Sequence, residues 1–129
     1  MPFEPASPES NYLNHAEDLA MLLESLPHRL DLVDGVLAWR PAQRGPVLGR
    51  ATDHRSRVAL DTLVRRLDRQ AAAAQDAVRE TVKAGKLDLL WTIAAVTEKE
   101  LRPAIAATRA ALSASSGEKE DHASLARTA

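Results

Sequence analysis

Apolar side chains recur at alternating spacings of four and three along the first part of the chain, through Tyr12, Ala16, Leu19, Leu23 and Leu26. This is the period of a helix that buries one face. Ser7-Pro8-Glu9, just before the stripe, is typical of a helix start, with an N-cap hydroxyl, a first-turn proline and an acid. The pattern predicts a helix over about residues 8–25, which Pro27 ends.

The next stretch, LDLVDGVLAW over residues 30–39, fits two structures. Asp34-Gly35 between apolar residues is a strong β-hairpin signal. As a helix, the same stretch gathers its large apolar side chains on one half of the surface and leaves Gly35 on the exposed side. No third strand is predicted, and an isolated hairpin is marginal in water. We therefore favour a helix from residue 27 or 28 to residue 40, which Pro41 ends, with the hairpin as the alternative.

Residues 41–52 hold two prolines and two glycines and are predicted to be a loop. The longest periodic segment follows, with Thr52 or Asp53 as its N-cap and Gly85 as the residue that ends the helix. Its apolar positions again alternate spacings of four and three, through Leu60, Val64, Leu67, Ala71, Ala74, Val78 and Thr81. Alanines at its centre, within residues 70–77, would let another helix approach closely.

A return helix is predicted from Lys86 to about Leu112. Its inward positions are Leu87, Leu90, Ala94, Leu101, Ile105 and Leu112. Pro103 lacks a backbone donor and collides with the preceding turn, so we expect a kink or a split near residues 97–103. From residue 113 onward the sequence is polar and aperiodic, which predicts a disordered tail.

Together these segments predict an all-α fold. Its arrangement is an antiparallel four-helix bundle over residues 1–112, with the last helix kinked or split at Pro103, followed by the tail at 113–129. A single domain of this length buries about two thirds of the surface that its unfolded chain exposes. Aromatic residues make up only 3% of the chain, so the core must consist mainly of aliphatic side chains.

Composition narrows the possible chemistry. The chain has no cysteine, which excludes disulfides, thiolate metal sites and cysteine nucleophiles. The acidic start, MPFEPASPES, does not resemble a signal peptide, and the longest apolar stretch is too short to cross a bilayer. We therefore expect a cytoplasmic protein without a membrane segment.

Histidines and acids form no catalytic or metal-binding pattern. The four histidines are His15, His28, His54 and His122, and none belongs to the Glu-x-x-His motif of dinuclear bundle sites. DHRSRVAL, which begins with Asp53-His54, resembles the phospho-accepting helix of histidine kinases, although Arg55 stands in place of the acid and Ala59 in place of the proline. The resemblance implies phosphotransfer by His54. We predict no catalytic residue, cofactor or metal, and a binding protein rather than an enzyme.

Charge is segregated along the chain despite a net charge of −1. Residues 1–34 carry seven acids and one arginine, and residues 35–69 carry eight arginines and three aspartates. Four arginines share one face of the long helix opposite its apolar seam: Arg55, Arg65, Arg66 and Arg69. Such a face could bind nucleic acid. Asp61 and Asp68 lie within helical reach of these arginines, Asp76 and Glu80 continue the face with the opposite sign, and the pI of about 6.4 is low for that function.

The favoured prediction is a small interaction or adaptor module that acts through helix–helix association, with itself as a dimer or with a protein partner. Nucleic-acid binding by the arginine face is the first alternative. The second is an enzyme, either a phosphotransfer protein that uses His54 or another enzyme built on the bundle. A helix at residues 30–39 would leave Trp39 partly exposed beside the arginine-rich loop. The predicted docking residues are therefore Leu32, Trp39, Arg40, Arg44 and Arg50.

Overall fold

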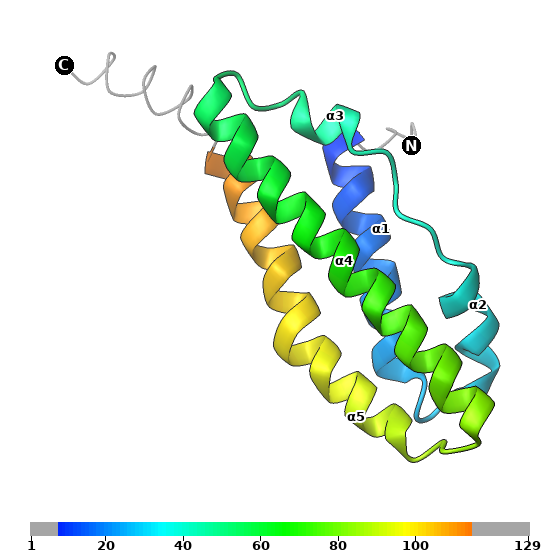
Figure 1. The fold of residues 1–129 in the computed structure, drawn as a ribbon. Helices are drawn as coiled ribbons and strands as arrows, with labels where there is room; N and C mark the ends of the chain where they lie inside the picture. The colour runs from blue at the N-terminus through cyan, green and yellow to red at the C-terminus, as the bar shows by residue number, and fades with distance from the viewer. Residues whose placement is uncertain (1–7, 115–129) are drawn as a thin grey trace, which may run out of the picture.

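The computed structural model describes residues 8–114, and every regular element of this part of the chain is a helix. Three long helical segments lie side by side (Figure 1). They are α1 (Pro8–Ser25), α4 (His54–Ala84), and a segment that begins with α5 (Leu89–Val96) and continues over residues 97–114. The first two run in the same direction, and the third returns antiparallel to both (Figure 1). The all-α prediction is confirmed; the predicted tail lies almost wholly outside the described residues.

Residues 30–39 are helical, so the hairpin alternative is wrong. Leu30–Leu32 form a short 3₁₀ helix, η1, and Val33–Ala38 form α2. The predicted helix is confirmed in type but is shorter than expected, because the backbone becomes extended at Trp39. Gly35 lies on the exposed side, as the apolar pattern predicted.

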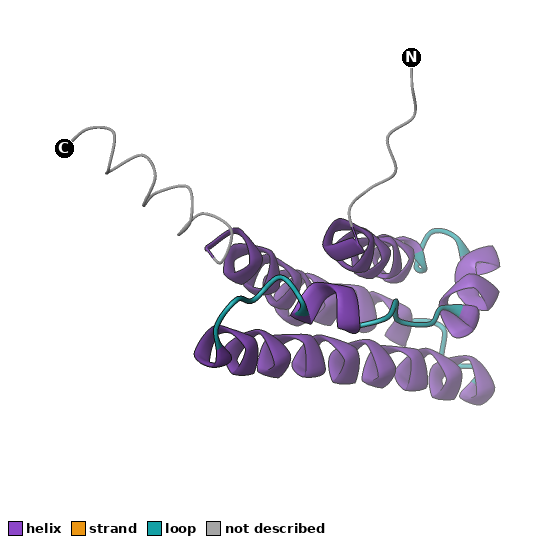
Figure 2. Cartoon of the chain, turned by 90° about the horizontal axis from the view of Figure 1, so that it is seen from above, coloured by secondary structure: helices purple, strands orange, loops and turns teal. Residues whose placement is uncertain are grey.

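Between α2 and α4 the chain runs back along the molecule without a long helix (Figures 1 and 2). The predicted loop contains one helical turn, α3 (Gly45–Leu48). Val47 on this turn is fully buried, which fixes the loop to the core. Both α2 and α3 contact α1 and α4. The second long helix expected of a four-helix bundle is therefore replaced by two short helices and an extended connection.

The long helix α4 follows the sequence prediction closely. The Asp53 carboxylate accepts a hydrogen bond from the Ser56 backbone N–H at 2.7 Å, as an N-cap residue does. Gly85 ends the helix with a φ of 71°, a conformation that glycine adopts without steric cost. All predicted seam residues are buried except Ala74, which is half-buried.

Pro103 is accommodated without a gap in the return helix. A π-helical turn, η2 (Thr97–Leu101), lies just before it, and the helix continues over residues 102–114. The Arg102 N–H donates to the Thr97 carbonyl, five residues back, so the wider turn absorbs the break in the usual hydrogen-bond ladder. The segment is therefore not split, and a kink stays a prediction. Leu87 is not inward as predicted, because it lies in the turn before α5 and is 42% exposed.

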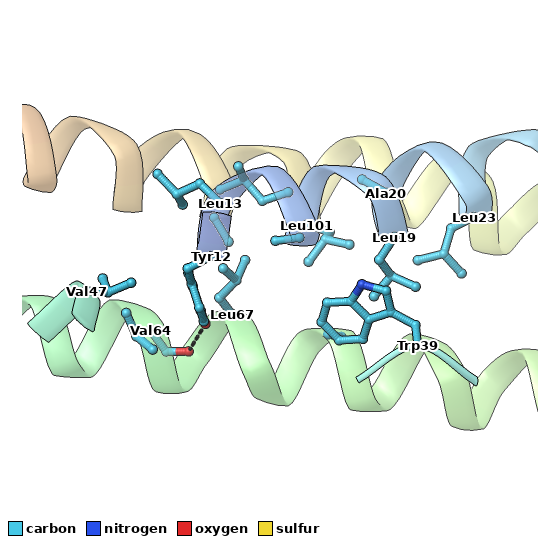
Figure 3. Packing of buried hydrophobic residues seen from close by; sticks show 14 of the residues in the cluster. Tyr12, Leu13, Leu19, Ala20, Leu23, Trp39, Val47, Val64, Leu67 and Leu101 are labelled. Atoms are coloured by element: carbon cyan, nitrogen blue, oxygen red, sulfur yellow. Dashed lines mark hydrogen bonds between the residues drawn. The ribbon is translucent and has the colours of Figure 1, made fainter. Parts of the chain in front are cut away.

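Tyr12 joins α1 to α4 at the edge of the apolar core (Figure 3). Its hydroxyl donates to the Asp68 carboxylate at 2.6 Å and lies 3.3 Å from the Val64 carbonyl oxygen. The Arg44 guanidinium is 3.5 Å from the other oxygen of Asp68. Burial, followed by the hydrogen bond to Asp68 and its negative charge, raises the pKa of Tyr12 well above its usual range.

We expect the Gly35→Ala variant to raise the free energy of unfolding by about 0.5–1 kcal/mol, because alanine favours a helix over the unfolded chain. A Cβ at Gly35 would lie 3.8 Å from the Leu22 Cδ1, an ordinary contact. Urea denaturation measures the change. The control is Gly85→Ala, which we expect to lower stability because φ is positive there. A destabilised Gly35→Ala protein would contradict the helical assignment.

The raised pKa of Tyr12 predicts a loss of stability at alkaline pH. Tyrosine in the unfolded chain ionises near pH 10, whereas the buried Tyr12 stays protonated, so the free energy of unfolding should fall as pH rises above about 10. Its contribution to the slope should approach about 1.4 kcal/mol per pH unit. Measuring the free energy of unfolding of Tyr12→Phe and of the wild type against pH isolates the contribution of Tyr12, since it is the only tyrosine. Equal alkaline slopes for the two proteins would refute this assignment.

Candidate functional site

Trp39 was expected to be partly exposed, and this expectation is wrong. Its side chain is only 8% exposed, its Nε1–H donates to the His15 carbonyl oxygen at 2.9 Å, and its ring stacks on the His15 imidazole. The reason is the end of α2 at Ala38. With extended backbone at Trp39, the indole turns into the core between α1 and α4 instead of lying at the edge of a helical stripe (Figure 3).

Polar groups around Trp39 hold the linker in place. The Gln75 side-chain amide on α4 donates to the carbonyl oxygens of Val36 at 2.8 Å and Trp39 at 2.7 Å. The Arg40 guanidinium also donates to the Trp39 carbonyl, and to that of Leu37. These donors bind carbonyls at the end of α2, where backbone N–H partners run out, although the Val36 carbonyl also accepts from the Trp39 N–H. The part of the predicted docking surface around Trp39 and Arg40 therefore has a clear structural role.

The remaining predicted docking residues do not gather at one place. Leu32 is half-buried in η1, whereas Arg50 is exposed just after α3, at the other end of the linker (Figure 1). Arg44 lies on the linker between them and reaches Asp68 on α4. A role for Leu32, Arg44 and Arg50 in partner binding stays a prediction, but they cannot form one compact patch.

The arginine face of α4 is only partly brought together. Arg65 and Arg69 line a shallow hollow with Arg44, while neither Arg55 nor Arg66 lines it. Asp68 also lines this hollow, and the Arg65 Nε donates to Asp61 at 2.8 Å. The carboxylates of Asp61 and Asp68 thus lie beside Arg65 and Arg44. They reduce the positive charge that this hollow offers to a phosphate.

A different surface emerges between α4 and α5. There a hollow of about 300 Å³ opens to solvent, and most of its lining is apolar or small. From α4 it is lined by Gln70, Ala73, Ala74 and Ala77, and from α5 and η2 by Thr92, Ile93, Val96, Thr97, Glu100 and Leu101. We call this hollow the α4–α5 groove. Its centre is the alanine-rich stretch, whose small side chains were expected to admit a closely packed helix.

Within the described residues, one side chain of the groove lining lacks apolar cover and another lacks a hydrogen-bond partner. Val96 is 45% exposed although it lies on an apolar wall. The Gln70 Oε1 is buried and finds no hydrogen-bond donor among the residues that the structure describes. Sequence reasoning identified the small side chains but did not place a groove here, because the inward seam of a helix gives no sign of whether its flank will be covered.

Other chemistry finds little support in the described part of the chain. No group of three or more histidine, aspartate or glutamate side chains within residues 8–114 could hold a metal ion. His54 is exposed at the first residue of α4, and His28 meets Trp91 edge-on at the surface. His122 lies outside the described residues. No helix within residues 8–114 has the length and apolar character to cross a membrane.

Comparison with known proteins adds no relative: no family model, curated protein or solved structure gives a match to the chain. The geometry of its own surfaces is therefore the basis for a functional proposal.

The Gln70 Oε1 has no hydrogen-bond donor within residues 8–114, whereas the Gln75 amide is hydrogen-bonded. We therefore expect glutamine-to-leucine substitutions at these two positions to change the free energy of unfolding in opposite directions. Gln70→Leu should raise the free energy of unfolding by about 1 kcal/mol, because it removes a buried acceptor that has no donor. Gln75→Leu should lower it by about 1–3 kcal/mol, because it removes two buried hydrogen bonds, one to the Val36 carbonyl and one to the Trp39 carbonyl. Chemical denaturation of both variants measures the difference. Equal effects would contradict these hydrogen-bond assignments.

Proposed function

We propose that this chain is a small interaction module that binds a helix in the α4–α5 groove. The observation that carries the proposal is the groove itself, an open apolar hollow with an alanine-rich wall. Helices that dock into such grooves present apolar side chains at spacings of three, four and seven residues. Small side chains on the receiving surface allow the two helix axes to come close, to about 8 Å.

Apolar surface beyond the groove supports the same function. Leu89, Ile93 and Val96 follow one another at helical spacings of four and three, so they share one face of α5. Leu89 is 42% exposed and Val96 is 45% exposed. Covering such side chains contributes about 25 cal/mol for each Å² of apolar surface removed from water. A docked helix therefore has an apolar face to cover that is longer than the groove.

The proposal also relates the predicted four-helix bundle to the complex with a partner. Within one chain, the linker from α2 to α3 lies where a bundle would have another long helix. A helix docked beside α4 and α5 would restore a bundle-like arrangement on the opposite flank of α4. On this proposal, the antiparallel four-helix bundle forms only when the partner helix is bound.

A charge placed in the groove tests the proposal. We expect Ala77→Glu to weaken partner binding at least about tenfold, since a buried carboxylate without a counter-charge is costly at an interface. Ala72→Glu is the matched control, because Ala72 is exposed on the same helix but does not line the groove. Partners captured from the source cells by the wild-type protein are identified, and their affinities for all three proteins are then measured.

Two results would contradict the proposal. One is binding of every partner to Ala77→Glu as tightly as to the wild type. The other is equal weakening by both substitutions, which would place the contact away from the groove. Circular dichroism of each variant checks that the fold is retained.

Nucleic-acid binding ranks second. Its support is the hollow lined by Arg44, Arg65 and Arg69. It is the weaker proposal because carboxylates lie beside Arg44 and Arg65. Phosphotransfer by His54 ranks third, since its support is the sequence resemblance alone.

A further inference from the structure

The charges along α4 are arranged so that they match opposite charges on a second α4 that runs antiparallel to it. Arg66, Ala73 and Glu80 are seven residues apart, so they lie along one stripe of the helix. Ala73, at the midpoint, lines the α4–α5 groove. Arg66 and Glu80 are both exposed, and neither forms an ion pair with another described residue. The stripe therefore has a small centre, a free cation on one side and a free anion on the other.

Antiparallel pairing of two copies about Ala73 satisfies these charges. In that arrangement, each residue faces the residue equally distant from Ala73 in the opposite direction. Arg66 of one copy meets Glu80 of the second, and symmetry repeats the contact, with each pair about 10 Å from the two-fold axis. Arg69 of one copy and Asp76 of the second are also nearly opposite, offset from this register by one residue.

The alternative orientation is unfavourable. Parallel pairing in register would place Arg66 against Arg66 and Glu80 against Glu80, so like charges would meet along the whole stripe. The antiparallel orientation also brings together the two alanine-rich centres, where helices can approach most closely. Charge thus selects the antiparallel orientation, and side-chain size supports the register centred on Ala73.

We propose that the occupant of the α4–α5 groove is a second copy of this chain, docked antiparallel through α4. Each α4 lies against the groove of the other copy, so two α4–α5 hairpins form one four-helix bundle. This inference rests on the proposed function, and it adds the partner, its orientation and its register.

Charge reversal at the stripe tests the pairing. Arg66→Glu and Glu80→Arg should each weaken the homodimer at least about tenfold, because each turns two attractive contacts into repulsive ones. An equimolar mixture of the two variants should recover a heterodimer of wild-type affinity, since every facing pair is again of opposite sign. Lys83→Glu is the matched control: it makes the same charge change on α4, but its antiparallel counterpart Leu63 is uncharged. Sedimentation velocity over a concentration series measures all these affinities.

A cross-linking experiment tests the register independently of charge. The chain contains no cysteine, so a single introduced thiol is unique. In Ala73→Cys the two thiols of a dimer face each other across the axis, and a short bis-maleimide should link them efficiently. Ala72→Cys, exposed on the same helix but outside the groove, should give little linked dimer.

Several outcomes would overturn the inference. They are a wild-type chain that stays monomeric up to about 100 µM, a dimer unaffected by either charge reversal, failure of the mixture to restore association, and equal cross-linking at residues 72 and 73. A monomeric chain whose other partners still depend on Ala77 would refute self-pairing and leave the proposed function standing. Binding of other partners that is unaffected by Ala77→Glu would refute the groove as their docking site. The homodimer is not judged by this variant, because residue 77 lies opposite Arg69 of the second copy.

Discussion

The buried seam of α4 is the surface on which the rest of the described structure depends. This helix has 31 residues, and its seam residues lie against α1 on one flank and α5 on the other. The short helices α2 and α3 also contact it. A helix of this length with one apolar face is stable in water only when that face is covered. Every other element can be understood as part of that cover.

The cover is uneven, and this explains where surfaces become available. On the flank of α1, the linker adds a second layer in which Trp39 and Val47 are buried and Gln75 of α4 binds two linker carbonyls. On the flank of α5, the side chains of α4 that point outward are alanines, which are too small to fill the space between the helices. The same short side chains that let α5 approach leave a groove beside it.

Charge segregation along the chain serves contacts between helices as well as the surface. Glu24 and Glu17 of the acidic first part form ion pairs with Arg102 and Arg109 near the end of the described chain, and these pairs tie the last helical segment to α1. In the arginine-rich part, Arg65 pairs with Asp61 one helical turn away. Exposed pairs of this kind stabilise a fold little, but they orient helices and decide which charges stay available.

Much of this could be predicted from the sequence, for local reasons. The period of apolar residues determined α1 and the seam of α4, and Asp53 and Gly85 determined the ends of α4, because caps and periodicity act within a few residues. The burial of Trp39, the short α2 and the open flank beside Ala73 and Ala77 could not be predicted in this way. They depend on where the extended linker finds space and donors on helices distant in the sequence. Periodicity shows which face of a helix must be buried, and only tertiary packing decides what covers it and what is left open.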